Sequence, residues 1–148
     1  TYERFVDERD FESLVRNYFE QYLGQFPAQV FDKINENFIR CSFFELVSRY
    51  LSSCYTFAIE QNNSEGRADF EMTGIPGTDY YTDDRLGEFK YYKAKEAEKM
   101  LGLDAPLPEH VEQVHRYAED TLRHFPNYKV RTYVVYICAN RGWKCWET

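Results

Sequence analysis

The chain has 148 residues, the usual size of one domain, and its net charge is −7 from 18 basic and 25 acidic residues. Hydrophobic residues make up 43% of the chain and aromatic residues 18%, which is ample for one core and excludes a disordered chain. The sequence contains no run of about 18 apolar residues that would span a membrane, and its start lacks the features of a secretory signal. The acidic balance argues against a broadly basic surface that would grip nucleic acid. An enzyme acting on nucleic acid would need clustered basic residues, a grip from another domain, or a substrate other than a long duplex.

The four cysteines show no metal-binding pattern. They form no C-x-x-C pair, and no histidine follows them at zinc-finger spacing. Three of them lie in apolar surroundings, as buried thiols usually do. We therefore expect buried, reduced thiols in a cytoplasmic protein, at Cys41, Cys54, Cys138 and Cys145.

Two helical regions are predicted at the start of the chain. The first runs from Asp10, a plausible N-cap, to Phe26, with apolar residues at alternating steps of three and one. Gly and Pro in residues 24–27 end it. A second helical region is predicted from Ala28 to Ser52.

The hydrophobic period then changes to that of β-structure. Residues 55–60 read as a strand, residues 62–66 as a turn rich in Asn, Ser and Gly, and residues 67–72 as the returning strand. A loop is expected over residues 74–84, and a third strand over residues 85–92.

The second half of the chain alternates helices and strands. A short helix is expected over residues 94–101, and a longer one over residues 107–125, with Pro108 in its first turn. The apolar period predicts a buried stripe on the longer helix, formed by Val111, Val114, Ala118, Leu122 and Phe125. Residues 130–139 form a nearly unbroken apolar run, typical of a buried central strand, and residues 143–146 are expected to add an edge strand. The order predicts an α/β domain whose mixed, α+β-like sheet is flanked by helices.

Two of the predicted strands carry a candidate catalytic cluster. Glu88 and Lys90 point to the same face of their strand, and Asp69 lies on the strand before. Two carboxylates from neighbouring strands suit a hard cation such as Mg²⁺ or Mn²⁺, which keeps waters at its other positions. Such an ion can activate a water for attack on a phosphodiester, and Lys90 can orient the water or offset charge on the phosphate.

The helix predicted over residues 107–125 adds candidate substrate contacts. Gln113 and Tyr117 are four residues apart and therefore share one face, from which they could reach a substrate phosphate or base. His110 precedes Gln113 by three residues and could face the same site, although we expect a solvated position.

These motifs resemble the PD-(D/E)XK nuclease superfamily. The resemblance runs over G-R-A-D at 66–69, E-F-K at 88–90 and Q-x-x-x-Y at 113–117, and covers roughly residues 38 to 146. It implies a restriction-endonuclease-like αβββαβ core with an extra N-terminal helix. The chain departs from the family pattern in its long gaps between motifs, in Ala68 where the family name has proline, and in Gly87 where a bulkier residue is commoner.

The resemblance also implies roles for individual residues. Asp69 and Glu88 match the metal-ligating acids and Lys90 the catalytic lysine. Glu45 falls on the helix before the first strand, where many members place another metal-site glutamate. Glu60 ends the first strand, where some members carry a further acid.

Three residues match substrate-contacting positions. Gln113 and Tyr117 correspond to the helix motif of exonuclease-like members. Arg67 either grips phosphate or pairs with Glu65 or Glu71, and the sequence does not choose between these roles.

The match is closest to a bacterial branch in which this domain follows an AAA-type ATPase-like region. We therefore expect that region in the full-length chain, which fits a start without methionine, and DNA rather than RNA as the substrate. Residues 1–36 are expected to form an N-terminal helical extension, and residues 37–148 the nuclease-like domain.

Other interpretations stay open. Glu88 and Lys90 could be an ion-paired face of an edge strand, Glu45 could simply pair with Arg49 one helical turn away, and Tyr117 could be plain core. The domain could also be a catalytically silent module for protein or nucleic-acid interaction, or have a fold unrelated to nucleases.

Overall fold

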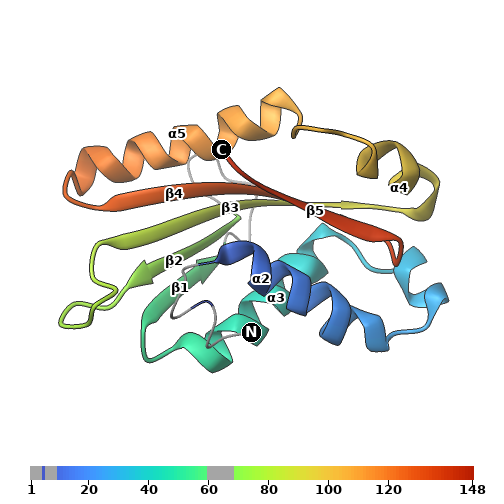
Figure 1. Cartoon of the computed structure of the whole chain (residues 1–148), viewed down its shortest axis with the longest axis horizontal. Coiled ribbons are helices and arrows are strands. Elements are labelled where there is room, and N and C mark those ends of the chain that lie inside the picture. The colour runs from blue at the N-terminus through green and yellow to red at the C-terminus, as the bar shows by residue number, and fades with distance from the viewer. Residues whose placement is uncertain (1–4, 6–9, 60–68) are drawn as a thin grey trace.

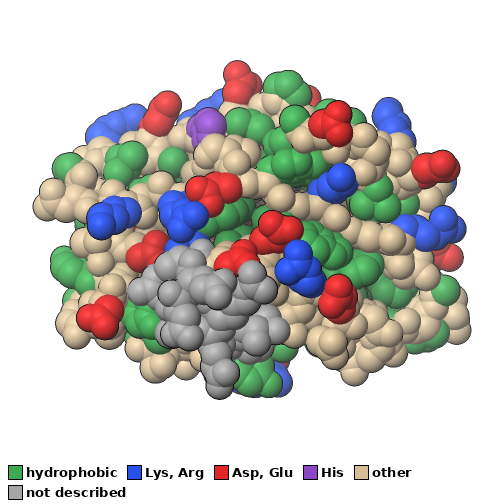
Figure 2. Space-filling model, viewed as in Figure 1, with side chains coloured by type: hydrophobic (Ala, Val, Ile, Leu, Met, Phe, Trp, Pro, Cys, Tyr) green, Lys and Arg blue, Asp and Glu red, His purple; other side chains and the backbone are tan. Residues whose placement is uncertain are grey.

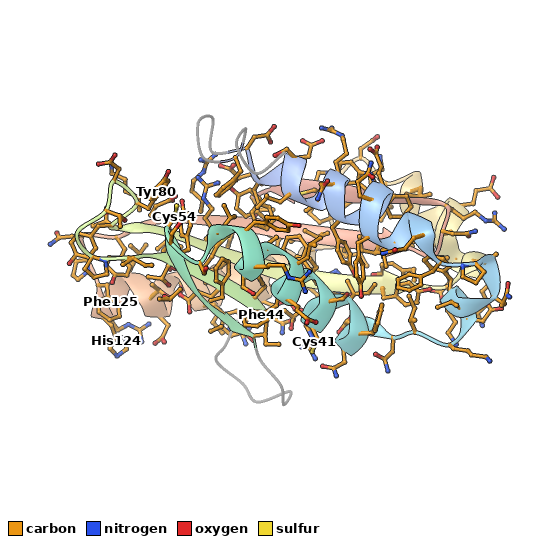
Figure 3. The ribbon with its side chains drawn as sticks, turned by 90° about the horizontal axis from the view of Figure 1, so that it is seen from below. Cys41, Phe44, Cys54, Tyr80, His124 and Phe125 are labelled. Atoms are coloured by element: carbon orange, nitrogen blue, oxygen red, sulfur yellow. The ribbon has the colours of Figure 1, made fainter. Side chains whose placement is uncertain are left out.

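The computed structural model describes Phe5, residues 10–59 and residues 69–148. A five-stranded sheet lies between two helical layers (Figure 1). Above it are α4 (Ala94–Leu101) and α5 (Pro108–His124), and below it are α2 (Phe11–Asn17) and α3 (Glu36–Leu51). Figure 3, seen from below, shows α2 and α3 side by side across the same face of the sheet. The predicted α/β class is confirmed.

The strands follow each other across the sheet in chain order. All neighbouring pairs are antiparallel except β3 and β4, which are parallel and are joined through α4 and α5. This mixed sheet has the predicted order of elements. Its strands are β1 (Tyr55–Ile59), β2 (Phe70–Gly74), β3 (Asp83–Tyr92), β4 (Lys129–Cys138) and β5 (Gly142–Glu147).

The two N-terminal helical regions are less regular than predicted. After α2, the chain forms a π-helical turn at Tyr18–Tyr22 and a 3-10 turn at Leu23–Gln25. The second region is split, because Ala28–Asp32 is a separate 3-10 turn and Asn35 adopts an extended conformation. The Asn35 side chain accepts a hydrogen bond from the Phe38 N–H at 2.9 Å and so caps α3, which begins at Glu36.

The lower core unites both helices with the sheet. Phe11 of α2 stacks on Tyr133 of β4, with 4.1 Å between ring centroids. Phe43 of α3 packs on Phe70 and Phe89, at 5.0 and 4.9 Å. Since α2 contributes to the same core as α3 and the sheet, the N-terminal helix completes this layer.

Gly87 has a packing reason to lack a side chain. A Cβ atom at this position would lie 2.8 Å from the ring of Phe89. Because Phe89 is fully buried, its ring needs the space that Gly87 leaves open. The departure from the bulkier family residue therefore follows from how the aromatic core packs.

The upper core differs from prediction along α5. The apolar period had placed Leu122 and Phe125 on the buried stripe, yet they are 39% and 51% exposed. The buried residues of α5 are instead His110, Val114 and Tyr117, so the buried ridge lies toward the N-terminal part of the helix. Phe125 lies at the far end, where Figure 3 labels it beside His124.

The described residues contain no helix that is long and apolar enough to cross a membrane. Of their four cysteines, only Cys138 is as buried as expected. All four are free, and the other three are half-buried.

Candidate active site

The carboxylates of Asp69 and Glu88 meet where β2 and β3 cease to pair. The last paired residues are Phe70 and Gly87, so one further step of the antiparallel register sets Asp69 opposite Glu88. Beyond that step, the backbone N–H of Phe89 donates to Asp69 Oδ2 at 3.0 Å. The side chain of Asp69 therefore takes a backbone donor of β3, which fixes it beside Glu88.

Glu88 is an acid buried without hydrogen-bond partners. Its exposed fraction is 0%, and neither carboxylate oxygen has a hydrogen-bond partner within the described part of the chain. Burial, and then the neighbouring Asp69 carboxylate, raise the pKa of Glu88 to about 9. Such a carboxyl requires either a proton or a nearby cation to be stable in this position.

Lys90 supplies one positive charge to this cluster. Its Nζ lies 3.7 Å from Glu88 Oε1 and 3.7 Å from Glu36 Oε2. The lysine side chain is 22% exposed, so it lies between the buried acid and solvent. The structure thus brings together Asp69, Glu88 and Lys90, the three residues singled out from the two strands.

Glu36 is a member of the cluster that the sequence reasoning missed. It is the first residue of α3, and burial raises its pKa, with Lys90 opposing this shift. Asn35 ends the preceding coil and starts the helix, and this capping signal could have located Glu36 at the helix start. The first turn of α3 therefore contributes the third carboxylate.

The structure places Glu45 away from this cluster. Its side chain is 75% exposed and pairs with Arg49 at 3.9 Å, the alternative that the i, i+4 spacing had offered. Nine residues along an α-helix advance about 13 Å and turn the side chain by about 180°, so Glu45 and Glu36 lie on opposite sides of α3. The glutamate of α3 that reaches the site is Glu36, and the assignment of Glu45 as a metal ligand is corrected accordingly.

A second cation, Arg40, pairs with Asp69. Arg40 Nη1 lies 2.9 Å from Asp69 Oδ1, and both side chains are at most 10% exposed. The same guanidinium donates from Nη2 to Asn37 Oδ1 at 3.1 Å. One turn of α3 therefore supplies both a carboxylate, Glu36, and a guanidinium cation, Arg40, to the site.

The Q-x-x-x-Y motif of α5 packs close to the sheet, and only part of it is accessible to solvent. Gln113 Nε2 donates to the Tyr117 hydroxyl at 3.3 Å. Tyr117 is 7% exposed and packs in the upper core, in line with the core alternative, whereas Gln113 is half-buried. Only Gln113 of this pair therefore retains an accessible polar group.

Two predicted site residues, Glu60 and Arg67, lie outside the described residues. Within the described ranges, no group of three or more His, Cys, Asp or Glu side chains is already arranged to hold a metal ion. Arg40 instead pairs with Asp69, and Lys90 lies 3.7 Å from both Glu88 and Glu36.

The face of the molecule on the β5 side mixes charges of both signs. Figure 2 shows Lys and Arg side chains interleaved with Asp and Glu on the face that surrounds the grey residues. No continuous basic surface of the kind that tracks a nucleic-acid backbone is seen on this face among the described residues. The net charge of −7 is consistent with this mixture.

The family of the chain follows from a comparison with protein-family models. Residues 34–147 match a model of the PD-(D/E)XK nuclease superfamily, and the chain belongs to this superfamily. No curated protein matches the chain. The match begins two residues before α3, so it includes Glu36 and Arg40 together with both acid-bearing strands.

Membership fixes the broad class of the protein. The five-stranded mixed sheet with its flanking helices is consistent with a restriction-endonuclease-like fold. The family is one of nucleases, which implies hydrolysis and nucleic acid as the substrate class, and its members generally use divalent metal ions.

Proposed function

We propose that this domain is a divalent-metal-dependent phosphodiesterase that acts on DNA. The carrying observation is the carboxylate of Glu88, which is fully buried beside Asp69, with no hydrogen-bond donor on its oxygens among the described residues and the Lys90 ammonium 3.7 Å away. A buried carboxylate whose oxygens lack donors matches the demand of Mg²⁺ or Mn²⁺ for hard oxygen ligands. The donor set therefore fits a divalent ion.

Asp69 and Glu88 would hold the ion, with Glu36 at the side of the site nearest solvent. A divalent ion held there would supply Lewis acidity, lowering the pKa of water and withdrawing charge from a phosphate. Lys90 keeps a positive charge between Glu88 and Glu36, where it can orient the attacking water and stabilise negative charge on the phosphate. Phe89 contributes through its backbone N–H, which holds Asp69 in position.

The remaining predicted residues fit this proposal as accessory groups. Gln113, the more accessible member of the Gln113–Tyr117 pair, would contact the substrate. Glu60 is proposed as an auxiliary acid at the end of the first strand, and Arg67 as a phosphate contact. Residues 1–36 would serve as a helical extension to a nuclease-like unit at 37–148, and the last residue of this extension, Glu36, would start α3 and reach into the site.

The partner and setting follow from the resemblance of the motifs. We propose that an AAA-ATPase-like region of the same full-length bacterial protein, in the cytoplasm, supplies the grip on DNA that this acidic domain lacks. The net charge of −7 supports a grip from elsewhere, because phosphate contacts need clustered Lys and Arg.

A cleavage assay tests the proposal. Single-stranded DNA, duplex DNA and RNA are each incubated with the protein in Mg²⁺ or Mn²⁺ and in EDTA. We expect cleavage of DNA that disappears in EDTA and in Asp69→Asn and Lys90→Ala. Lys99→Ala, which changes an exposed lysine of α4, is the matched control and should cleave normally. Retained cleavage in both site variants would overturn the catalytic assignment.

A second candidate function has one observation in its favour. The Arg40–Asp69 ion pair already satisfies the acid without a metal, as expected of a nuclease-fold module that only binds a partner. Mn²⁺ titrations of thermal stability separate the two functions. An ion that stabilises the wild type but not Asp69→Asn indicates a live metal site, whereas no shift at millimolar Mn²⁺ favours the silent module.

A further inference from the structure

A histidine lies beside the candidate site, and the proposed chemistry does not use it. His110 is in the first turn of α5 and is 9% exposed, contrary to the solvated position expected from sequence. Its Nδ1 lies 2.6 Å from the hydroxyl of Tyr136, and the two rings meet edge to face. Tyr136 is the residue of β4 that pairs with Lys90 of β3. His110 is thus connected to the site through the residue next to the lysine.

The hydrogen bonds around Tyr136 indicate which nitrogen of His110 carries the proton. The Tyr136 oxygen accepts a hydrogen bond from the backbone N–H of Leu107 at 2.9 Å. The Tyr92 hydroxyl donates to the same oxygen: burial raises the pKa of Tyr136 and of Tyr92, and this hydrogen bond opposes the rise at Tyr136 but adds to it at Tyr92. With two donors already on its oxygen, Tyr136 needs an acceptor for its own proton, and Nδ1 of His110 lies at the right distance. A neutral imidazole that accepts at Nδ1 carries its proton on Nε2.

The environment favours this neutral form. Burial, and then the charge of Lys90, lower the pKa of His110. The charged groups that oppose this effect are Glu109, its neighbour on α5, and Asp69 on the sheet. His110 therefore keeps one free N–H, because Nε2 has no hydrogen-bond partner in the described part of the chain.

Three features around that N–H suit an anion. The ammonium of Lys90 is near enough to affect His110. The imidazole belongs to the first turn of a 17-residue helix, whose N-terminus carries partial positive charge. The half-buried amide of Gln113 follows one helical turn later on the same face.

We propose that His110 is a substrate-binding residue, which donates its Nε2–H to a non-bridging phosphate oxygen of the nucleic-acid substrate. Tyr136 is then a positioning residue, which holds the imidazole in the donating tautomer. This inference rests on the proposed nuclease function and names a contact within the same site.

Nuclear magnetic resonance tests the tautomer independently of any cleavage. Spectra of ¹⁵N-labelled side chains should show His110 protonated at Nε2 alone at neutral pH, with the signal assigned by its loss in His110→Gln. In Tyr136→Phe this preference should weaken. A His110 protonated at Nδ1 in the wild type would overturn the proposal.

Addition of a short DNA oligonucleotide tests the contact. With Ca²⁺ in place of Mg²⁺ to limit turnover, the His110 Nε2–H signal should shift, whereas His115, an exposed histidine of α5, should not. Binding of DNA without a change at His110 would overturn the proposal while leaving the nuclease function standing.

Kinetics separate substrate binding from a purely structural role. His110→Ala should raise KM roughly 10-fold or more, the effect of losing one hydrogen bond to a charged group, with kcat changed less than about threefold. His110→Gln, whose amide can place a donor near Nε2, should recover most of the affinity. His115→Ala is the matched control. Loss of kcat at unchanged KM, or unchanged constants in His110→Ala, contradicts the assignment; absence of all cleavage in the wild type refutes the nuclease function instead.

Discussion

The guanidinium of Arg40 lies 2.9 Å from the carboxylate of Asp69, in an ion pair that solvent barely reaches. A protein cation thus lies at the acid to which the proposed metal would bind. Both cannot interact fully with the same carboxylate oxygen, so metal binding and the Arg40 contact are expected to compete.

Replacement of Arg40 by Met should therefore have opposite effects with and without metal. In EDTA, the variant leaves the buried carboxylate of Asp69 without its guanidinium partner, and we expect a loss of about 3 kcal/mol in unfolding free energy. With millimolar Mn²⁺ the loss should shrink, because the ion replaces the missing charge. Urea unfolding in both conditions measures the difference.

Arg49→Met provides the control for Arg40→Met. Arg49 is on the same helix, but it is 64% exposed, and its ion-pair partner among the described residues is the exposed Glu45. Its removal should change stability by less than about 1 kcal/mol in either condition. An Arg40→Met variant whose destabilisation is the same with and without Mn²⁺ would show that Arg40 does not compete with a metal.

The two glutamates of α3 make a matched pair of variants. Glu36→Gln removes a charge 3.7 Å from Lys90, and we expect it to lower the cleavage rate at least about tenfold and to weaken Mn²⁺ binding. Glu45→Gln changes an exposed side chain on the opposite side of the helix and should leave both unchanged. Cleavage assays and calorimetric Mn²⁺ titrations compare them, and equal behaviour of the two variants would remove Glu36 from the site.

This pair also shows how far sequence reasoning reaches. The alternation of Glu88 and Lys90 around the buried Phe89 follows from strand geometry, and the structure reproduces it. Which glutamate of α3 reaches the site was harder to predict, because the answer depends on where the helix starts and how it is rotated against the sheet. Those are set by the Asn35 cap and by the packing of Phe43, which a continuous helical pattern over 28–52 does not reveal.

Tertiary packing explains the other differences. Leu122 and Phe125 fit the apolar period of α5, but only the ridge of His110, Val114 and Tyr117 meets the sheet. The Arg40–Asp69 pair joins residues 29 positions apart, a contact that no local pattern predicts. The order of strands was predictable because each strand has its own hydrophobic period and turn signals.

A buried acid outside the candidate site makes stability depend on pH. Burial, and then the nearby Glu71 carboxylate, raise the pKa of Asp84 to about 8. The folded chain keeps a proton that the unfolded chain releases above about pH 4. Folding therefore takes up a proton between about pH 4 and 8, and stability should fall as pH rises through that window, by at most about 1.4 kcal/mol per pH unit.

Asp84→Asn isolates this effect, since the amide resembles the protonated acid. Urea midpoints of the variant should fall less steeply from pH 5 to pH 8 than those of the wild type, although Glu88 still contributes a slope of the same sign. The control is Asp79→Asn, at an exposed position, which should keep the wild-type slope. A slope unchanged by Asp84→Asn would mean that Asp84 is ionised in the folded chain.

The packing at Gly87 affects both the lower core and the candidate site, because Gly87 lies against the ring of Phe89 and the Phe89 N–H donates to Asp69. Gly87→Ala would place a Cβ atom 2.8 Å from the Phe89 ring, which is enclosed by Phe43 and Phe70. We expect a loss of about 1–3 kcal/mol in unfolding free energy from overpacking. Gly102→Ala, where the new Cβ would meet its nearest atoms at an ordinary 3.5 Å, should cost much less.

A double-mutant cycle identifies the cause of the Gly87→Ala effect. Phe89→Leu alone removes aromatic packing, but in combination with Gly87→Ala it also removes the clash. The double variant should therefore lose less unfolding free energy than the two single variants together. Strict additivity would mean that the ring is not what excludes a side chain at Gly87.

Because the Phe89 N–H holds Asp69, a Phe89 ring displaced by the added methyl group would also shift the Asp69 carboxylate. Gly87→Ala should therefore weaken Mn²⁺ binding, and Phe89→Leu should restore part of it.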